Sequence, residues 1–456
     1  MPASAAKPRA KPFLALAQAF RDGNDSPSLL LDRGLADIDA LEAGLEVFTA
    51  IDRPGAMKAA DASSKRWREG KPLSAIDGMP MGVKDVIETR DMPTQMGSPL
   101  FAGHNTHYDS ASVRALREAG AVIVGKTVTT EFAATEPGPT RNPWDTTRTP
   151  GGSSSGSAAG TAAGFFCAAL GTQVVGSILR PASYCGVFGM KPTIGAINRG
   201  GSMDHMSQSA QGVLAATMAD GWAVLRAIAD RAGGDAGSPG LFGPQSMPAA
   251  KPPKALAFIE TPGWGETGDA AKAAFEGAMK RLRDAGVAIK TRRDTPAIEA
   301  AEIALQRAMI LTRKINAWES RWPLNTFSDR DATKLSKTMR DRLVEAEAMT
   351  LEEYRGHIAE REKVREVYAK LAAVAEGIVT LSAPAEAPVG IAATGNPIYV
   401  VPGSLLGVPA LSLPVLACNN LPLGLQVLGF QHKDGELIAT AAAIEGIVGA
   451  GSAVRA

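Results

Sequence analysis

Cysteine, aromatic residues and net charge are all scarce in this sequence of 456 residues. It has three cysteines and no Cys-x-x-Cys pair, which argues against a disulfide scaffold. Aromatic residues make up only 5% of the chain, a composition that does not favour an aromatic binding surface. Because apolar residues reach 45%, we expect a large hydrophobic core to hold the fold together.

Excess charge of either sign is also missing. The chain has 48 basic and 47 acidic residues, so no strong field attracts nucleic acid or an anionic membrane. The sequence also lacks an apolar run of about 18 residues and a signal-peptide pattern at its N-terminus. We predict a cytoplasmic protein that acts on a small molecule and binds neither nucleic acid nor membrane. The sequence is also compatible with a homodimer.

Metal-ligand patterns are absent from the sequence as well. The five histidines are scattered, and His104 and His107 share a polar loop without a clear carboxylate partner. Cys185 lies in an apolar stretch, which indicates a buried structural cysteine and not a nucleophile. We predict neither a metal site nor another cofactor.

Strand and helix patterns alternate along the chain and predict an α/β fold with a sheet covered on both faces. After a disordered tail over 1–11 we expect N-terminal helices within 12–70. Further helices are expected at 111–119, at 269–285 and over much of 297–375. Strands are expected at 80–87, 121–124, 378–381, 410–413 and 424–428.

One motif resembles a nucleotide-binding loop. Residues 120–127, GAVIVGKT, match the phosphate-loop pattern G-x-x-x-x-G-K-T. A phosphate cradle needs a flexible loop that precedes a helix, whereas the middle of this motif is itself an apolar, β-branched strand. The sequence therefore does not favour a nucleotide site here.

A second motif resembles the nucleophile elbow of α/β-hydrolases. Residues 152–156, GSSSG, match G-x-S-x-G and would make Ser154 the nucleophile of an esterase. The elbow requires a strand directly before it, but residues 141–150 contain two prolines and no alternation of polar and apolar residues. This function remains an alternative.

A third, dispersed set of motifs is more specific. Residues 151–193 are similar to the signature segment of the amidase signature family. Residues 78–85, GMPMGVKD, resemble the lysine strand of that family, and further matches occur at 120–132, 141–144, 407–410 and 421–426. The resemblance implies a single large domain over 12–456, with a central mixed sheet between helices. A variable helical insertion is expected at about 230–375.

The resemblance also implies a catalytic triad. The nucleophile of the family falls on Ser177, its bridging serine after a cis peptide bond on Ser153, and its base on Lys84. The oxyanion hole falls on the backbone N–H groups of residues 174–177, namely Val174, Val175, Gly176 and Ser177. Ser154 and Thr172 take supporting positions.

These residue types suit the chemistry. A serine hydroxyl is a weak nucleophile until a base removes its proton. Lys84 can accept that proton only when neutral, so its pKa must fall from about 10.4, and burial has this effect on lysine. Ser153 would carry the proton between Ser177 and Lys84 and later return it to the leaving amine.

The sequence departs from the common family pattern beside the nucleophile. Gln173 stands where the family often has aspartate, and Val175 stands where it often has glycine. We expect these changes to reshape the acyl pocket and include Gln173 among candidate substrate-binding residues. Arg180 is a second candidate, for pairing with a polar or carboxylate group; a structural ion pair is the alternative. The pocket walls are expected at 134–140, 200–210 and 305–325, where Trp318 and Trp322 could either line the pocket or pack helices.

These observations predict a hydrolase that cleaves an amide or carbamate C–N bond through an acyl-enzyme on Ser177. Two alternatives remain. One is a subunit of an amidotransferase that releases ammonia within a tRNA-modifying complex, as some relatives of the family do. The other is the esterase with Ser154 as its nucleophile.

Overall fold

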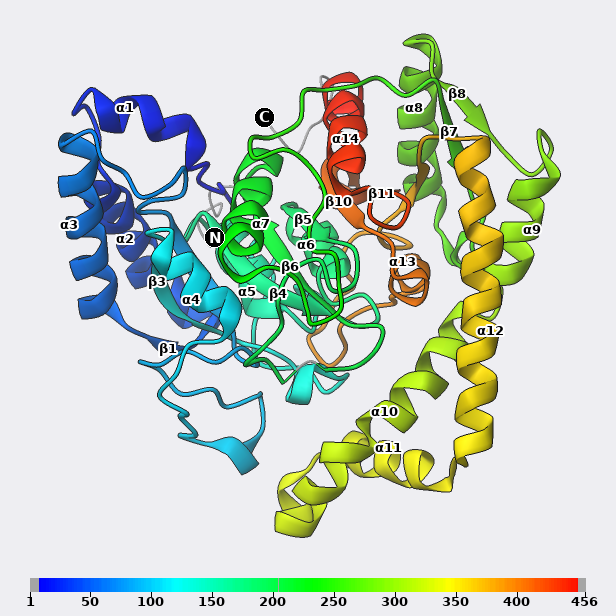
Figure 1. Cartoon of the computed structure of the whole chain (residues 1–456), viewed down its shortest axis with the longest axis horizontal. Helices are drawn as coiled ribbons and strands as arrows, with labels where there is room; N and C mark the ends of the chain where they lie inside the picture. The colour runs from blue at the N-terminus through cyan, green and yellow to red at the C-terminus, as the bar shows by residue number, and fades with distance from the viewer. Residues whose placement is uncertain (1–7, 204, 450–456) are drawn as a thin grey trace.

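The computed structural model describes residues 8–203 and 205–449 (Figure 1). Over these residues the strands are β1 (Phe48–Ile51), β2 (Pro80–Lys84), β3 (Val122–Thr127), β4 (Ala168–Gln173), β5 (Phe188–Lys191), β6 (Ala210–Ala215), β7 (Ala255–Phe258), β8 (Ala288–Lys290), β9 (Ile378–Leu381), β10 (Ala410–Cys418) and β11 (Leu421–Leu428). The α-helices are α1 (Ala17–Arg21), α2 (Pro27–Leu45), α3 (Arg53–Arg68), α4 (Ala111–Glu118), α5 (Ser155–Ala163), α6 (Leu179–Cys185), α7 (Met218–Ala232), α8 (Asp269–Asp284), α9 (Pro296–Leu305), α10 (Ala308–Asp331), α11 (Lys337–Ala348), α12 (Leu351–Ala369), α13 (Val401–Leu406) and α14 (Asp434–Gly449). Most of the tail predicted over 1–11 lies outside the described residues.

All the strands of the described chain belong to one mixed sheet. Its order is β1-β3-β2-β4-β6-β5-β10-β11-β9-β7-β8. The strands β3, β2 and β4 run parallel, whereas β4, β6, β5, β10, β11 and β9 are successively antiparallel. The predicted single α/β domain with a central mixed sheet flanked by helices is therefore confirmed.

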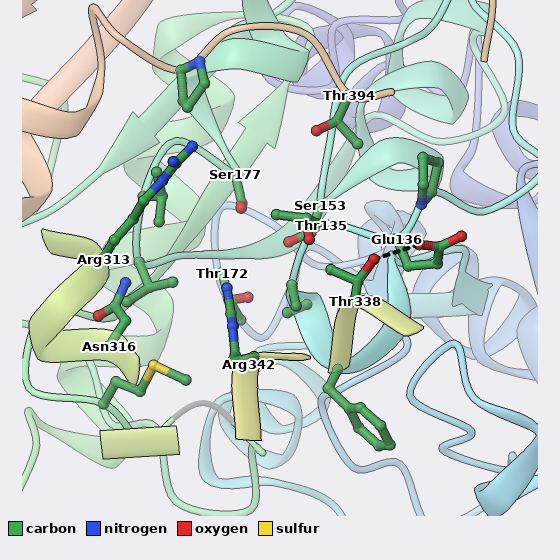
Figure 2. Close-up of a pocket in the computed structure, with 18 of the residues that line it drawn as sticks. Thr135, Glu136, Ser153, Thr172, Ser177, Arg313, Asn316, Thr338, Arg342 and Thr394 are labelled. Carbon is green, nitrogen blue, oxygen red and sulfur yellow. Dashed lines mark hydrogen bonds between the residues drawn. The ribbon is translucent and has the colours of Figure 1, made fainter. Parts of the chain in front are cut away.

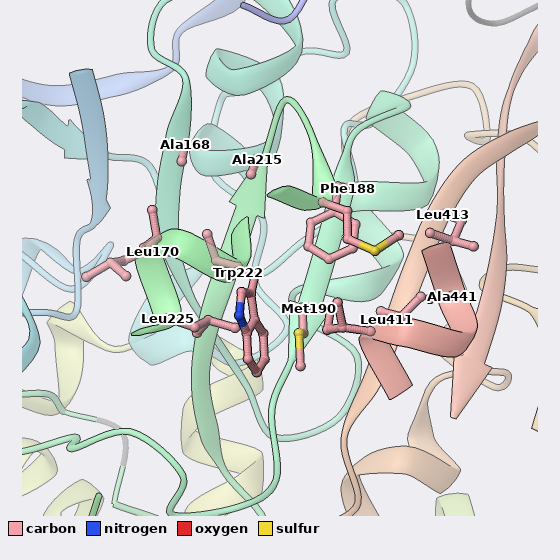
Figure 3. Packing of buried hydrophobic residues seen from close by; sticks show 14 of the residues in the cluster. Ala168, Leu170, Phe188, Met190, Ala215, Trp222, Leu225, Leu411, Leu413 and Ala441 are labelled. Carbon is pink, nitrogen blue, oxygen red and sulfur yellow. The ribbon is translucent and has the colours of Figure 1, made fainter. Parts of the chain in front are cut away.

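The sheet separates two hydrophobic cores. Successive residues of a strand point to opposite faces, so Ala168 and Leu170 of β4 join one core while Ala169 joins the other. Figure 3 shows the first core, where Trp222 of α7 packs near Met190 of β5. The second core contains the small residues of α5 and the apolar residues of α6 and α13. Both cores hold the central strands rigidly, as a precise site requires.

Several short strands were not predicted from the sequence. The predicted strands at 80–87, 121–124, 378–381, 410–413 and 424–428 all occur, with shifted ends. Strands β1, β5, β6, β7 and β8, of three to six residues each, were not predicted, although the predicted strand β9 has only four residues. Periodicity alone does not separate strands of this length from other short apolar segments.

The region from 230 to 375 is not purely helical, which corrects the prediction of a helical insertion. Strands β7 and β8 lie within it and extend one edge of the sheet. Helices α10, α11 and α12 extend away from the sheet at the lower right of Figure 1. No helix in the described ranges is both long and apolar enough to cross a lipid bilayer.

Candidate active site

The site begins where two neighbouring parallel strands end. Strand β2 ends at Lys84 and strand β4 ends at Gln173, and the two strands pair in parallel through Val83 and Leu170. The carboxyl ends of parallel strands meet at one edge of a sheet. Residues that lie far apart in the sequence, Lys84 and Thr172, are therefore neighbours.

Lys84 is fully buried, and its amine forms hydrogen bonds to two hydroxyl groups. Its Nζ lies 2.6 Å from Ser153 Oγ and 2.8 Å from Thr172 Oγ1. A third, longer contact of 3.4 Å reaches the carbonyl oxygen of Thr172. These contacts fix the amine next to Ser153, which is the position predicted for the base of the triad.

Ser153 lies in the loop before α5. Its peptide bond with Gly152 is cis, as the family resemblance implies. The backbone N–H of the next residue, Ser154, donates to the carbonyl oxygen of Ser177 over 3.2 Å. The two serine segments are thus joined by their backbones directly beside the predicted nucleophile.

Ser177 lies in the turn between β4 and α6, and its side chain reaches the cavity although only 5% of the residue is exposed. No hydrogen bond joins its hydroxyl to Ser153 among the described residues. Contacts of this kind often tighten only when the substrate binds. Both serines line the same cavity.

The turn at residues 174–177 has free backbone donors. In the described part of the chain, none of its four N–H groups donates a hydrogen bond to the protein. The glycine of the turn is required, because a Cβ on Gly176 would clash with Val400 Cγ2 of the segment leading into α13. Four adjacent free donors suit the stabilisation of an oxyanion. Val174 and Val175 line the cavity at this point.

Gln173 has a different place from the one predicted for a substrate-binding residue. Its Oε1 accepts hydrogen bonds from the N–H groups of Ile178 and Leu179 at 2.9 and 3.0 Å, at the start of α6. Its Nε2 donates to Ser404, whose hydroxyl donates in turn to the carbonyl oxygen of Val175. The fully buried amide is therefore committed to holding the 174–177 turn and does not line the cavity.

Arg180 is buried at the edge of the cavity and donates hydrogen bonds to three protein groups. It donates to the carbonyl oxygens of Gly395 and Gly152 at 2.7 and 2.6 Å, and to Thr394 Oγ1 at 2.9 Å. Burial lowers the pKa of Arg180 to about 10, and the charge of Tyr184 opposes this shift. No ion pair of Arg180 occurs within the described ranges. Arg180 borders the cavity, but its guanidinium serves to fix the segment before Ser153.

The cavity in front of the serines has a volume of about 640 Å³, a size suited to a small molecule. Figure 2 shows Ser177, Ser153 and Thr172 on one side, facing residues from α10 and α11. The walls predicted at 134–140, 200–210 and 305–325 all contribute. Two further walls, at 338–345 and 392–397, were not predicted from the sequence, because neither segment carries a local motif.

Trp318 and Trp322 do not line this cavity. They border a neighbouring hollow with His205 and Tyr354. Trp318 stacks on Tyr354 with ring centroids 5.3 Å apart, whereas Trp322 is 64% exposed. Trp318 thus packs helices, which was one of the two expectations.

The competing motifs do not form the sites that they resemble. Residues 122–127 are strand β3, and Lys126 is buried in an ion pair with Asp85 at 3.3 Å, so no phosphate loop exists there. No strand precedes Ser154, whose hydroxyl donates to the carbonyl oxygen of Thr172 and lies outside the cavity. Cys185 is buried and unbridged, as predicted.

The amino-acid sequence of this chain is similar to those of known proteins. The sequence model of the Amidase family matches residues 30–438. The chain belongs to the Amidase family. The predicted membership of the amidase signature family is thereby confirmed.

Among curated proteins, the family members most similar in sequence include amidotransferase subunits. A glutamyl-tRNA(Gln) amidotransferase subunit from Anaeromyxobacter sp. (strain K) is 44% identical over 211 residues, covering 45% of this chain and 43% of that relative. This chain thus matches less than half the length of that relative. The protein of the same name from Salinispora arenicola (strain CNS-205) is 30% identical over 487 residues, covering 95% of this chain and 96% of the relative.

Solved structures of amidases share the whole fold. One crystal structure of an amidase superposes with a TM-score of 0.83 at 26% identity, covering 96% of this chain and 100% of that one. The native peptide amidase from Stenotrophomonas maltophilia superposes with a TM-score of 0.74 at 26% identity, covering 96% and 97% of the two chains.

Proposed function

We propose that the protein hydrolyses an amide-type C–N bond, in an amide or a carbamate, through an acyl-enzyme on Ser177. The observation that carries the proposal is the contact between Lys84 Nζ and Ser153 Oγ, beside Ser177 and four backbone donors that are free within the described chain. A fully buried amine beside a hydroxyl can act as a base once it is neutral.

The proposed reaction has two steps. Ser177 Oγ attacks the carbonyl carbon, and its proton passes through Ser153 to Lys84. The N–H groups of the 174–177 turn stabilise the oxyanion while the C–N bond breaks, and the same path returns the proton to the leaving amine. Water then attacks the acyl ester, and its proton follows this path to restore Ser177.

The test is a panel of small amides and carbamates with purified wild type and four alanine variants. We expect Ser177→Ala, Ser153→Ala and Lys84→Ala each to lose at least about 1,000-fold in kcat, in line with other serine hydrolases. Ser154→Ala is the matched control and should keep most of the activity. Wild-type activity in Ser177→Ala together with loss in Ser154→Ala would instead support the esterase mechanism.

A second candidate is an amidotransferase subunit, supported by the names of the curated relatives. The same triad would then release ammonia only within a complex. Hydrolysis of simple amides by the purified chain alone favours the independent hydrolase. Ammonia release from glutamine that appears only with partner subunits favours the complex.

A further inference from the structure

Two arginines extend into the cavity from the wall opposite the serines. Arg313 comes from α10 and Arg342 from α11, and both line the cavity with Ser153 and Ser177. In Figure 2 the side chain of Arg342 ends in front of Thr172, whereas that of Arg313 extends away from Thr172 and ends on the side of Ser177. They are therefore placed to contact a substrate bound at Ser177.

Neither arginine is held by a partner in the described part of the chain. Within residues 8–203 and 205–449, no hydrogen bond or ion pair joins Arg313 or Arg342 to another residue. Arg342 is half-buried, so its guanidinium has given up part of its water without gaining a protein acceptor there. Such a group retains a strong need for an anionic or polar partner.

Three acidic residues line the same cavity, and two of them are in ion pairs. Asp341 pairs with Lys337 at 2.6 Å and Glu345 pairs with Lys314 at 2.9 Å, while Glu136 accepts a hydrogen bond of 3.1 Å from the hydroxyl of Thr338, which also lines the cavity. Among the described residues, the cavity lining thus has two arginines without a hydrogen bond or ion pair, whereas only one of its three carboxylates, Glu136, has no ion pair.

The two arginines also repel each other. Burial lowers the pKa of Arg342, Glu345 opposes this shift and the positive charge of Arg313 adds to it. An anion bound near both guanidinium groups would relieve this repulsion, and a planar carboxylate suits the fork of an arginine.

We propose that Arg313 and Arg342 form a subsite for a free carboxylate of the substrate, so that the preferred substrates are amides or carbamates that also carry a carboxylate. This inference rests on the proposed hydrolysis at Ser177, whose cavity it extends. Arg180 differs from these two arginines, because both of its terminal guanidinium nitrogens already donate to Gly152, Thr394 and Gly395.

The experiment compares two matched pairs of substrates by kcat/KM. In the first pair the carboxylate is on the acyl side: the mono-4-nitroanilide of succinic acid against pentanoyl 4-nitroanilide. In the second it is on the amine side: N-butyryl-β-alanine against N-propylbutanamide. We expect wild type to prefer the carboxylate in one pair, and that pair locates the subsite on the acyl or the amine side.

The same ratio is then measured in variants. Arg342→Gln and Arg313→Gln should each lower the preference for the carboxylate by about 10- to 100-fold, as the loss of a charge-assisted hydrogen bond does. Arg342→Lys should keep part of the preference, because the charge remains but the fork is lost. The control is Arg330→Gln, since Arg330 is an exposed arginine of α10 outside the cavity, and its ratio should equal that of wild type.

The outcomes separate this inference from the proposed function. Hydrolysis that depends on Ser177 but shows no preference in either pair overturns the carboxylate subsite alone. Equal losses for charged and neutral substrates in the arginine variants also overturn it. Activity that survives in Ser177→Ala overturns the hydrolytic mechanism itself.

Discussion

Lys84 and Ser153 are 69 positions apart in the sequence, yet Lys84 Nζ donates a hydrogen bond of 2.6 Å to Ser153 Oγ. Both residues are fully buried, and the contact joins the end of β2 to the loop before α5. Thr172 Oγ1 accepts a second hydrogen bond from the same amine.

The first prediction concerns Thr172. Thr172→Val removes the hydroxyl 2.8 Å from Lys84 Nζ but keeps the volume of the side chain. We expect kcat to fall about 5- to 30-fold, corresponding to about 1–2 kcal/mol for one hydrogen bond to a charged or polar partner. The pH–rate profile should shift as well, because the surroundings of the amine change. Thr172→Ser is the control; a loss as large as that of the valine variant would refute the role of the hydroxyl.

The second prediction concerns the buried amide of Gln173. Gln173→Leu leaves the N–H groups of Ile178 and Leu179 without their acceptor. We expect the free energy of unfolding to fall by about 1–3 kcal/mol and kcat to fall because the 174–177 turn shifts. Urea denaturation and steady-state kinetics measure the two effects. Gln173→Glu keeps an acceptor for both N–H groups and should lose less kcat; a greater loss in this variant would contradict the capping role.

The third prediction concerns the buried ion pair of Lys126 and Asp85, 3.3 Å apart. Burial lowers the pKa of Lys126 and raises that of Asp85, while each charge opposes the shift of the other. Lys126→Met leaves a buried carboxylate unpaired, and we expect the free energy of unfolding to fall by about 3–5 kcal/mol.

Urea denaturation tests the pair with two comparisons. Lys280→Met removes an exposed lysine of the pair with Asp284 and should change stability by less than about 1 kcal/mol. The double variant Asp85→Asn with Lys126→Met should be more stable than Lys126→Met alone. A double variant less stable than the single one would show that the pair does not account for the loss.

The fourth prediction concerns the pH dependence of stability. Burial lowers the pKa of Lys191 to about 7, although the charge of Asp434 opposes the shift and Arg365 adds to it. The unfolded chain keeps this proton up to about pH 10.4. Between these two values the unfolded state binds more protons, so Lys191 makes the free energy of unfolding rise with pH.

Subtracting the unfolding free energy of Lys191→Met from that of wild type at each pH removes the contribution of the other titrating groups. The difference in unfolding free energy, wild type minus Lys191→Met, should rise between pH 7 and pH 9 by up to about 1.4 kcal/mol per pH unit. The control Lys65→Met removes a lysine whose side chain is 72% exposed, and its difference should stay flat. A flat difference for Lys191→Met would contradict the lowered pKa.

Local sequence alone determined much of this protein. Some short elements were predictable, among them strand β9, with four residues, and helix α4, with eight, because apolar patterns and capping act over a few residues. The family was recognisable from several ordered motifs, and these also selected Lys84, Ser153 and Ser177. Their catalytic roles remain predictions, but the structure places all three around one cavity.

Only the tertiary structure decided what the neighbouring polar residues contact. Gln173 and Arg180 were candidate substrate ligands in the sequence, yet both make hydrogen bonds to protein groups: Gln173 to the N–H groups of Ile178 and Leu179, and Arg180 to the carbonyl oxygen of Gly395, 215 positions away. Arg313 and Arg342 lie in no recognisable motif, so the sequence did not indicate them. The structure does, because α10 and α11 place both arginines at the cavity, where neither has a hydrogen bond or an ion pair among the described residues. The physical reason is that the type of a residue determines which interactions its side chain can make, whereas long-range packing determines which partner it meets.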